Sequence, residues 1–400
     1  MRNMTTTVVI AAGAVLAVST AHAAIINVPG DEPNIQAGID AAMNGDEVVV
    51  AQGEYFENIN LSKAITLRST DPNDPLVVAN TIINGGGVFP STVVTCAGVG
   101  ADTVLSGFVI TGGNANVAGG MYNLLQSNPT VTNCTFSGNT STSDGGAMRN
   151  ILNSNPTVTN CTFIGNTADT DGGGISNVGG GTATVTNCTF VGNTADADGG
   201  GIYSTSNFMV TDCTFDANTA VSGGGIFNKS NTAVVDGCTF DGNIADQTGG
   251  GMSSDGGSQT VTNCMFNGNS AGDSGGGMSN VGGSTVTVTN CAFSGNMVNG
   301  DGGGMSNQAS TATVTDCSFS GNTALADGGG IWNAIDGTMT VTDSAFCNNS
   351  PRHMLGVIPL SQVQMNAFCP IPVCPGDING NGAVNVTDLL QMLGAWGSCP

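Results

Sequence analysis

The C-terminal segment places oxygen-bearing side chains at the spacing of a calcium-binding loop. Counting from Asp377, they stand at positions 1, 3, 5, 9 and 12, with Gly382 at position 6 and a backbone carbonyl at position 7. The predicted ligands are Asp377, Asn379, Asn381, Ala383, Asn385 and Asp388. Because only two of them are carboxylates, we expect weak calcium binding of the extracellular type. An ordinary turn rich in Asn and Gly is the alternative interpretation.

Acidic residues also recur at one position of a repeated segment in the middle of the chain. Each precedes a run of glycines, and the set comprises Asp144, Asp171, Asp198, Asp301 and Asp327. If the repeats stack, these carboxylates lie ~4.8 Å apart and repel one another unless water or cations screen them. A calcium-binding stripe is one interpretation. A solvated face is the other, and it is favoured because serine and threonine interrupt the column.

A catalytic centre for polysaccharides needs more than carboxylates. Lyases need a basic proton acceptor beside an acidic cluster, and hydrolases need paired carboxylates. The repeated body contains only Arg149 and Lys229, and His353 lies beyond the last repeat. Arg149, near Asp144 and Asp171 in the sequence, is the one candidate for such a centre. The sequence therefore favours a non-enzymatic protein, with a polysaccharide lyase as the alternative.

Eight of the 13 cysteines occupy one repeated position: Cys134, Cys161, Cys188, Cys213, Cys238, Cys264, Cys291 and Cys317. We interpret them as free, buried thiols that act as small apolar side chains, because the ninth repeat has Ser344 in their place. Disulfides between repeats and a metal-binding thiolate ladder are the alternatives. Cys374 and Cys399 bracket the calcium loop and form a candidate disulfide; Cys347 with Cys369 is another.

Export is predicted from the N-terminus and from the charge. Arg2, an apolar run over residues 7–18 and a small-x-small motif at residues 21–23 indicate a signal peptide cleaved near Ala24. The apolar run is too short for a membrane anchor, and no other stretch could span a bilayer. A net charge of −23 repels phosphate backbones, which argues against nucleic acid as a partner.

These residues are positioned by a repeat that dominates the chain. Nine copies of a Val-Thr-Asn-Cys-Thr-Phe-like segment begin at Val131 and recur every 25–27 residues. The position immediately before the Cys holds only Asn, Asp or Gly, the residues that tolerate left-handed backbone. We interpret this position as a corner between two short strands, with a third strand at each Gly-Gly-Ile/Met segment. Stacked repeats bury one continuous core, which predicts a single-stranded right-handed parallel β-helix.

Stacking would align like residues in columns. Asn139, Asn166 and Asn193 begin one predicted amide ladder, and a second follows the Gly-Gly-Ile/Met segments. A turn ladder is favoured over a ligand-binding stripe, because stacked amides satisfy buried polar groups. Apolar columns are predicted inside, with members such as Phe163, Phe190, Cys161 and Cys188.

Several of these motifs carry family resemblances. The Phe-x-x-Asn and Gly-Gly-x-Ile/Met tetrapeptides resemble the repeats of polymorphic outer membrane proteins, which are bacterial surface adhesins. Residues 29–87 look like the opening of pectin-lyase-like β-helix proteins, and there residues 34–43 are expected to form a helix that caps the first turn. The loop that ends at Asp388 resembles the calcium loop of dockerin modules, of which this chain has one copy. The resemblance implies a surface or secreted protein.

The predicted organisation is a signal peptide over residues 1–23, a cap and first turns over 24–100, the repetitive β-helix over 101–350, a linker over 351–373 and a calcium-loop and helix module over 374–400. The predicted function is a non-enzymatic structural, adhesive or glycan-binding rod with calcium as its cofactor. An extracellular glycan or surface protein is the expected partner. The sequence leaves the ligand and the oligomeric state open.

Overall fold

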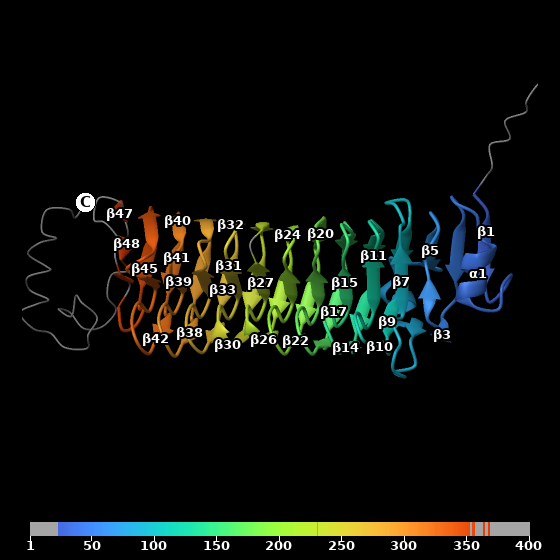
Figure 1. Ribbon diagram of the computed structural model, residues 1–400, viewed down its shortest axis with the longest axis horizontal. Helices are drawn as coiled ribbons and strands as arrows, with labels where there is room; N and C mark the ends of the chain where they lie inside the picture. Colours follow the sequence, from blue (N-terminus) through green and yellow to red (C-terminus); the bar gives the residue numbers. More distant parts are fainter. Residues whose placement is uncertain (1–22, 230, 353, 357–362, 365–366, 369–400) are drawn as a thin grey trace, which may run out of the picture.

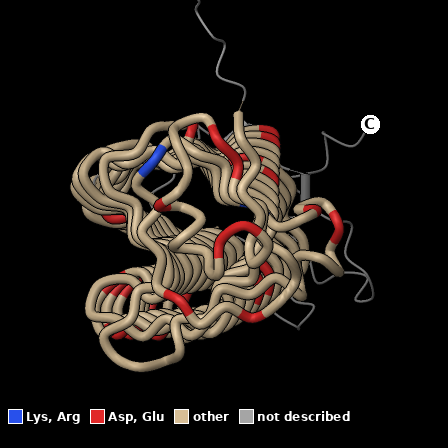
Figure 2. The backbone as a smooth tube through the Cα atoms, turned by 90° about the vertical axis from the view of Figure 1, so that its right-hand side faces the viewer, with Lys and Arg blue, Asp and Glu red and all other residues tan. Residues whose placement is uncertain are grey.

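The protein folds into a long β-solenoid whose axis follows the order of the chain from blue to red (Figure 1). The structure is a computed structural model, and it describes residues 23–229, 231–352, 354–356, 363–364 and 367–368. Each winding of the chain, here called a rung, pairs in parallel with the rung before it and the rung after it. Seen along the axis, successive rungs superimpose (Figure 2).

Sheet A has 14 strands. They are β1 (Ile25–Val28), β2 (Glu47–Val50), β5 (Thr66–Ser69), β8 (Val104–Ser106), β12 (Thr130–Thr132), β16 (Thr157–Thr159), β20 (Thr182–Thr186), β24 (Asn207–Thr211), β28 (Thr232–Asp236), β32 (Ser258–Thr262), β36 (Thr285–Thr289), β40 (Thr311–Thr315), β44 (Thr338–Thr342) and β47 (Val363–Gln364). In the repeats, each strand buries its valine and turns its threonines outward.

Sheet B has 13 strands. They are β3 (Gly53–Phe56), β6 (Thr81–Asn84), β9 (Val109–Thr111), β13 (Thr135–Ser137), β17 (Thr162–Ile164), β21 (Thr189–Val191), β25 (Thr214–Asp216), β29 (Thr239–Asp241), β33 (Met265–Asn267), β37 (Ala292–Ser294), β41 (Ser318–Ser320), β45 (Ala345–Cys347) and β48 (Ala367–Phe368). In the repeats, the central Phe of each strand points into the core.

Sheet C has 12 strands. They are β4 (Ile59–Asn60), β7 (Val94–Ala97), β11 (Met121–Leu124), β15 (Met148–Asn150), β19 (Ile175–Asn177), β23 (Ile202–Ser204), β27 (Ile226–Lys229), β31 (Met252–Asp255), β35 (Met278–Val281), β39 (Met305–Asn307), β43 (Ile331–Asn333) and β46 (Met354–Gly356). These are the strands predicted from the Gly-Gly-Ile/Met segments.

A fourth sheet was not predicted. Sheet D has nine short strands, β10 (Asn114–Ala115), β14 (Thr140–Ser141), β18 (Thr167–Ala168), β22 (Thr194–Ala195), β26 (Thr219–Ser222), β30 (Ile244–Thr248), β34 (Ser270–Ala271), β38 (Met297–Val298) and β42 (Thr323–Ala324). Each repeat therefore has four strands instead of three. Most sheet D strands have two residues and bury one small side chain, so they are too short for alternation to reveal them.

The predicted corners are left-handed. All nine corner residues have φ between 49° and 63°: Asn133, Asn160, Asn187, Asp212, Gly237, Asn263, Asn290, Asp316 and Asp343. One residue at positive φ reverses the alternation of side chains, so the Val before the corner and the Cys after it both point inward. The corner explains why these two apolar residues stand three positions apart in the sequence.

The core is built from stacked identical side chains. Nine phenylalanines from Phe136 to Phe346 stack with ring centroids 4.6–5.0 Å apart and ring planes within 7° of parallel. Columns of valine, cysteine and isoleucine or methionine lie beside them, all almost fully buried. Burial of each phenylalanine contributes roughly 2–3 kcal/mol of hydrophobic free energy.

An amide ladder follows sheet B. It runs through Asn139, Asn166, Asn193, Asn218, Asn243, Asn269, Asn296, Asn322 and Asn349. Taking Asn193 as the example, its Oδ1 accepts from the backbone N–H and side-chain N–H of Asn166, at 3.1 and 2.9 Å. Its Nδ2 donates to the Phe163 carbonyl at 2.9 Å and to Asn218 Oδ1 at 2.9 Å. The buried amide groups of this column thereby satisfy one another.

A short helix lies at the N-terminal end of the rod (Figure 1). The helix predicted for residues 34–43 is α1 (Ile35–Ala41); Ile35 and Ile39 are buried, and a Cβ on Gly38 would lie 3.0 Å from side chains of β1 and β2. Lys63 donates to three carbonyls at the C-terminal end of α1. The role of α1 as a cap over the first rung stays a prediction. A second helix, α2 (Pro75–Ala79), was not predicted.

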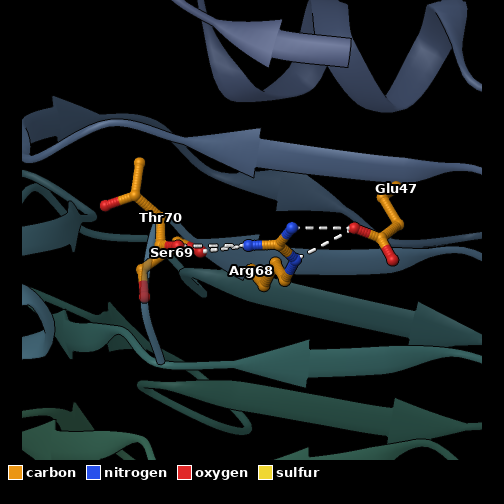
Figure 3. Close-up of polar contacts among 4 residues, drawn as sticks. All are labelled: Glu47, Arg68, Ser69 and Thr70. Carbon is orange, nitrogen blue, oxygen red and sulfur yellow. Dashed lines mark hydrogen bonds and ion pairs between the residues drawn. The ribbon is translucent and has the colours of Figure 1, made fainter. Parts of the chain in front are cut away.

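The outer face of sheet A carries an ion pair near this end (Figure 3). Arg68 on β5 lies 2.9 Å from a carboxylate oxygen of Glu47 on β2, and it also donates to the carbonyls of Ser69 and Thr70. Both side chains are partly exposed, so the pair contributes little to stability. It nevertheless shows that this end of sheet A carries charge.

Three predicted features lie outside the described residues. They are the signal peptide, most of the linker, and the calcium-loop module with Cys374 and Cys399. They stay predictions. Within the predicted linker, the described residues include β46, β47 and β48, which extend sheets C, A and B.

We expect Asn218→Ala to lower the free energy of unfolding by about 3 kcal/mol or more. The change removes Asn218 Oδ1, which accepts from the backbone and side-chain N–H groups of Asn193, and it removes the Nδ2 that donates to the Phe190 carbonyl. Asn243 Oδ1 loses the same side-chain donor but keeps the Asn218 backbone N–H. Each buried group left without a partner costs ~1–3 kcal/mol. Urea unfolding followed by circular dichroism measures the loss. The control is Asn267→Ala on the outer face of β33. Equal losses from the two variants would contradict the stabilising role of the ladder.

Candidate functional site

The outer face of sheet C gathers the least repetitive side chains of the solenoid. Within β15, Met148 and Asn150 point inward, so Arg149 points outward, and the in-register pairing continues this outward column on both sides. The outward column contains Tyr122, Arg149, Ser176, Tyr203, Phe227, Ser253, Ser279, Ser306 and Trp332. We call it the sheet C face.

The aspartate column lies directly beside this face. Each aspartate precedes a glycine with positive φ, such as Gly145 at 71°, where an added Cβ would lie 2.6 Å from the Met148 carbonyl oxygen. This tight turn brings the aspartate next to the outward residue five positions later. The same geometry places Thr248 Oγ1 3.0 Å from Ser253 Oγ, and Ser274 Oγ 3.1 Å from Ser279 Oγ. Glycine is therefore required there by close backbone approach.

Arg149 is held by an ion pair. Its Nη2 lies 2.7 Å from Asp144 Oδ2, and the two side chains are 18% and 15% exposed. The Thr170 hydroxyl donates to the other oxygen of Asp144. Arg149 Nε and Ser176 Oγ, neighbours on the face, are buried and have no hydrogen-bond partner among the described residues. The Arg149 guanidinium is thus neutralised by Asp144.

Asp171 and Asp198 form a carboxylate pair on adjacent rungs. The Asp198 backbone N–H donates to Asp171 Oδ1 at 3.0 Å. Burial raises the pKa of Asp171, and burial together with repulsion from Asp171 raises the pKa of Asp198 to about 6. The positive charge of Lys229 lowers both pKa values and so partly offsets this effect. Both basic residues of the repeated body therefore act on this one face.

Two aromatic rings on the sheet C face lie near the carboxyls of Asp171 and Asp198 and near Lys229. Tyr203 and Phe227 stack with centroids 5.8 Å apart, and both are more than 90% buried. Burial, and then the charge of Asp171, raises the pKa of the Tyr203 hydroxyl, so Tyr203 is neutral at physiological pH. Tyr122 and Trp332, farther along the face in either direction, are only partly buried. These two rings are the ones that a ligand can reach.

The aspartates of the column stand one to a rung, on separate windings of the chain. Within the described part of the chain, no group of three or more His, Cys, Asp or Glu side chains is placed to hold a metal ion. The solvated face and the calcium-binding stripe both stay predictions, and the burial of Asp171 and Asp198 shows that these two carboxyls are only partly solvated. The predicted calcium ligands from Asp377 to Asp388 lie outside the described residues.

The cysteine column is a set of free thiols inside the core. All eight predicted members, and also Cys96, are free and buried. Each thiol of the column bonds to nearby carbonyls; Cys161 Sγ, for example, lies 3.3 Å from the Thr159 carbonyl oxygen. Burial raises the pKa of Cys96 to about 12, which keeps it protonated and unreactive. Cys347 is disulfide-bonded.

A cleft of about 490 Å³ lies elsewhere, between α2 and the corner of sheets A and B. Its walls include Pro72, Pro75, Val78, Asn133 and Thr162. They contain no acidic, basic or imidazole side chain. The cleft therefore offers shape but no acid–base chemistry.

The comparisons with known proteins agree with this architecture. The family described as the right-handed beta helix region matches residues 34–203 and 172–304, and the chain belongs to that family. The repeat of Chlamydia polymorphic membrane proteins matches residues 316–334, which confirms the predicted likeness to those repeats. No curated protein matches the chain.

Two solved structures are similar to this chain at 13% identity. One is a mannuronic acid specific polysaccharide family 6 lyase from human gut microbiota, with 83% of this chain and 88% of that chain covered and a TM-score of 0.36. The other is the A-module of the mannuronan C-5 epimerase AlgE6 from Azotobacter vinelandii, with 84% and 94% covered and a TM-score of 0.35. A likeness this distant says nothing about activity.

Sequence reasoning found part of the sheet C face. It identified Arg149 and the aspartates, and the structure brings Arg149 to Asp144. It missed the aromatic residues and the place of Lys229. The outward position of these aromatic residues could have been predicted from the sequence. Tyr203 and Trp332 each follow the buried Ile of a Gly-Gly-Ile segment, and successive side chains of a strand point to opposite faces.

We expect Asp198→Asn to stabilise the protein near neutral pH. A folded-state pKa of about 6, raised above 3.8, means that the fold disfavours the charged form. The resulting penalty is absent below about pH 4, where the carboxyl is protonated in both states, and it grows as the pH rises through about 6. Full conversion of the pKa shift would give about 3 kcal/mol at about pH 7.5, and solvent screening of this partly exposed carboxyl makes the gain smaller. Thermal unfolding at several pH values measures it.

The control for this prediction is Asp196→Asn on the same turn, where the side chain is exposed. This variant should not change the pH dependence of unfolding. An Asp198→Asn variant that is destabilised at neutral pH, or a gain that persists undiminished at about pH 4, would contradict the prediction.

Proposed function

We propose that this protein is an exported, rigid β-helix rod that binds glycans along the sheet C face and performs no catalysis there. The observation that carries the proposal is the arrangement of Tyr122, Trp332 and the aspartates beside unbroken ladders of strands. Aromatic rings offer apolar faces to sugar rings, and the neighbouring carboxylates accept hydrogen bonds from sugar hydroxyls.

The charges near Arg149 support a binding role over a catalytic one. The Arg149 guanidinium is paired with Asp144 and offers hydrogen-bond donors but no acceptor, so it does not suit the role of a proton acceptor. The partly buried rings of Tyr122 and Trp332 are the parts of this face that a sugar can reach. The surrounding negative charge of the chain disfavours acidic polysaccharides, so we propose a neutral glycan as the ligand.

The match to the polymorphic membrane protein repeat supports a place outside the cell or on its surface. In the described part of the chain, no helix combines the length and apolar character needed to cross a membrane. We propose that the predicted signal peptide exports the chain and that the predicted dockerin-like loop stabilises a C-terminal tail, which attaches the rod to a surface partner.

A polysaccharide-acting enzyme is the second candidate. One observation favours it. At one place on the rod, Asp171 and Asp198 have raised pKa values, and their charges and that of Lys229 act on one another and on the Tyr203 hydroxyl. An enzyme of this kind would release unsaturated sugar products, whereas a binding rod would leave the polymer intact.

We expect Trp332→Ala to weaken glycan binding about tenfold, which corresponds to roughly 1.4 kcal/mol lost with one aromatic contact. A glycan array identifies the ligand, and calorimetry then measures the affinity. The control is Phe56→Ala, which removes an aromatic side chain that is 69% exposed on sheet B. Absence of any bound glycan, or equal losses in both variants, would contradict the proposal. Unsaturated products that disappear in Arg149→Ala would favour the enzyme.

We also expect the mature chain to bind calcium through its C-terminal loop. Calorimetry should show binding with a dissociation constant of about 10⁻⁴–10⁻³ M, and Asp377→Ala should abolish that heat because the variant loses one of two carboxylate ligands. Asp144→Ala is the matched control in the aspartate column. If both variants bind calcium like the wild type, the loop does not hold the ion.

A further inference from the structure

The outer face of sheet A becomes a two-dimensional array of hydroxyl groups toward its C-terminal end. Four consecutive strands, β32, β36, β40 and β44, each turn three side chains outward. Eleven of the twelve are threonine and one is serine: Ser258, Thr260, Thr262, Thr285, Thr287, Thr289, Thr311, Thr313, Thr315, Thr338, Thr340 and Thr342. We call this surface the threonine array.

The array is regular because the strands pair without any shift of register. Thr287 pairs with Thr260 and Thr313, and Thr340 continues the same column. Its rows are therefore ~4.8 Å apart along the rod, and its columns are ~6.7 Å apart across it. The Thr315 and Thr342 hydroxyl oxygens lie 3.0 Å from each other, so neighbouring rows can share a hydrogen bond.

The array is also rigid. The inward residues of the same strands, such as Val288, Val314 and Val341, are fully buried, so the backbone beneath the array is held by the core. A β-branched threonine has few side-chain rotamers, so little entropy is lost when its hydroxyl is ordered. A flat ligand with a matching repeat can therefore bind without any rearrangement of the array, so little conformational entropy is lost on binding.

The charge distribution narrows the choice of ligand. The chain has a net charge of −23, yet none of the twelve positions is charged. Carboxylates stand only at the borders of the array: Asp236 on the preceding rung accepts from the Thr262 hydroxyl at 2.6 Å, Asp316 and Asp343 stand at the corner, and Asp336 precedes the last strand. The array also contains no aromatic side chain on which a sugar ring could stack. The N-terminal end of the same sheet differs, because it carries the Arg68–Glu47 ion pair (Figure 3).

We propose that the threonine array binds ice. Each hydroxyl has one donor and two acceptor sites, as a water molecule in a lattice requires, and the methyl groups between the hydroxyls restrict water to ordered positions. Like the oxygen atoms at a face of an ice crystal, the hydroxyl groups of the array repeat at fixed spacings in two directions. A growing ice lattice excludes ions with their hydration shells, so the neutrality of the array suits this ligand. The inference is independent of glycan binding on the sheet C face.

The full mature chain tests the proposal in two measurements. The first is thermal hysteresis, the gap between melting and freezing of a small ice crystal; the second is the fraction of protein that enters slowly growing ice. The wild type should show hysteresis and enrichment in ice. Thr313→Lys, at the centre of the array, should reduce the hysteresis about tenfold, because the ammonium ion keeps its own hydration shell at the ice surface. Thr287→Lys repeats the test on the neighbouring rung.

The matched control is Ser318→Lys, which adds the same charge to an exposed position on sheet B of the same rung. It should retain wild-type activity, and all variants should melt at the same temperature by circular dichroism. A wild-type chain that neither shapes ice nor enters it overturns the proposal, as does full activity of both array variants. A wild-type dimer that becomes a monomer in Thr313→Lys would overturn it, because the array would then be an interface between two copies of the chain. Binding to insoluble cellulose or chitin without binding to ice would overturn it in favour of a glycan.

Discussion

Parallel pairing in register between successive rungs is the constraint on which the rest of this structure depends. It places every side chain directly above its counterpart one repeat earlier, so each position in the repeat becomes a column. Inside, like residues stack well: flat phenylalanine rings lie on one another, and amides exchange hydrogen bonds. Outside, like charges repel at the same separation. The aspartate column accordingly runs for three rungs, is replaced by serine and threonine for three, and then resumes.

The two asparagine columns differ in whether every rung supplies an asparagine, and this difference changes how many of their buried amide groups are hydrogen-bonded. The column from Asn139 to Asn349 is unbroken, and each member bonds to the next at about the same distance. The column in sheet C is broken by Ser204 and Ser254, and Ser204 bonds to the Ser206 carbonyl of its own rung instead. Next to these breaks, Asn177 Nδ2, Asn228 Oδ1 and both polar atoms of the Asn280 amide lack partners among the described residues. Buried amides near the breaks therefore lack the hydrogen bonds that every member of the unbroken column makes with its neighbours.

The repeat allowed most of the fold to be predicted from sequence. Spacing alone indicated the corner at Asn160, because only a left-handed residue returns Val158 and Cys161 to one face. Sheet D was missed for a physical reason: a strand such as β18 buries a single alanine and has no periodicity to detect. The sheet C face was only half predicted. Its aromatic residues are visible in the sequence, but their contact with the aspartates depends on the backbone path of a turn. Glycines allow that path, and they also allow many others, so the sequence does not determine it.

The two surfaces that we propose for binding use the repeat in opposite ways. On the sheet C face, the outward position varies from Tyr122 to Arg149, Ser176, Tyr203 and Phe227, so each rung offers different chemistry and a ligand must recognise one place. On the threonine array, the outward positions are nearly invariant over four rungs, so a ligand must itself be periodic. Only an uncharged side chain can be repeated in this way without repulsion between rungs. The same stacking that limits the aspartate column to short runs therefore makes a neutral lattice the surface that a β-helix can extend most readily.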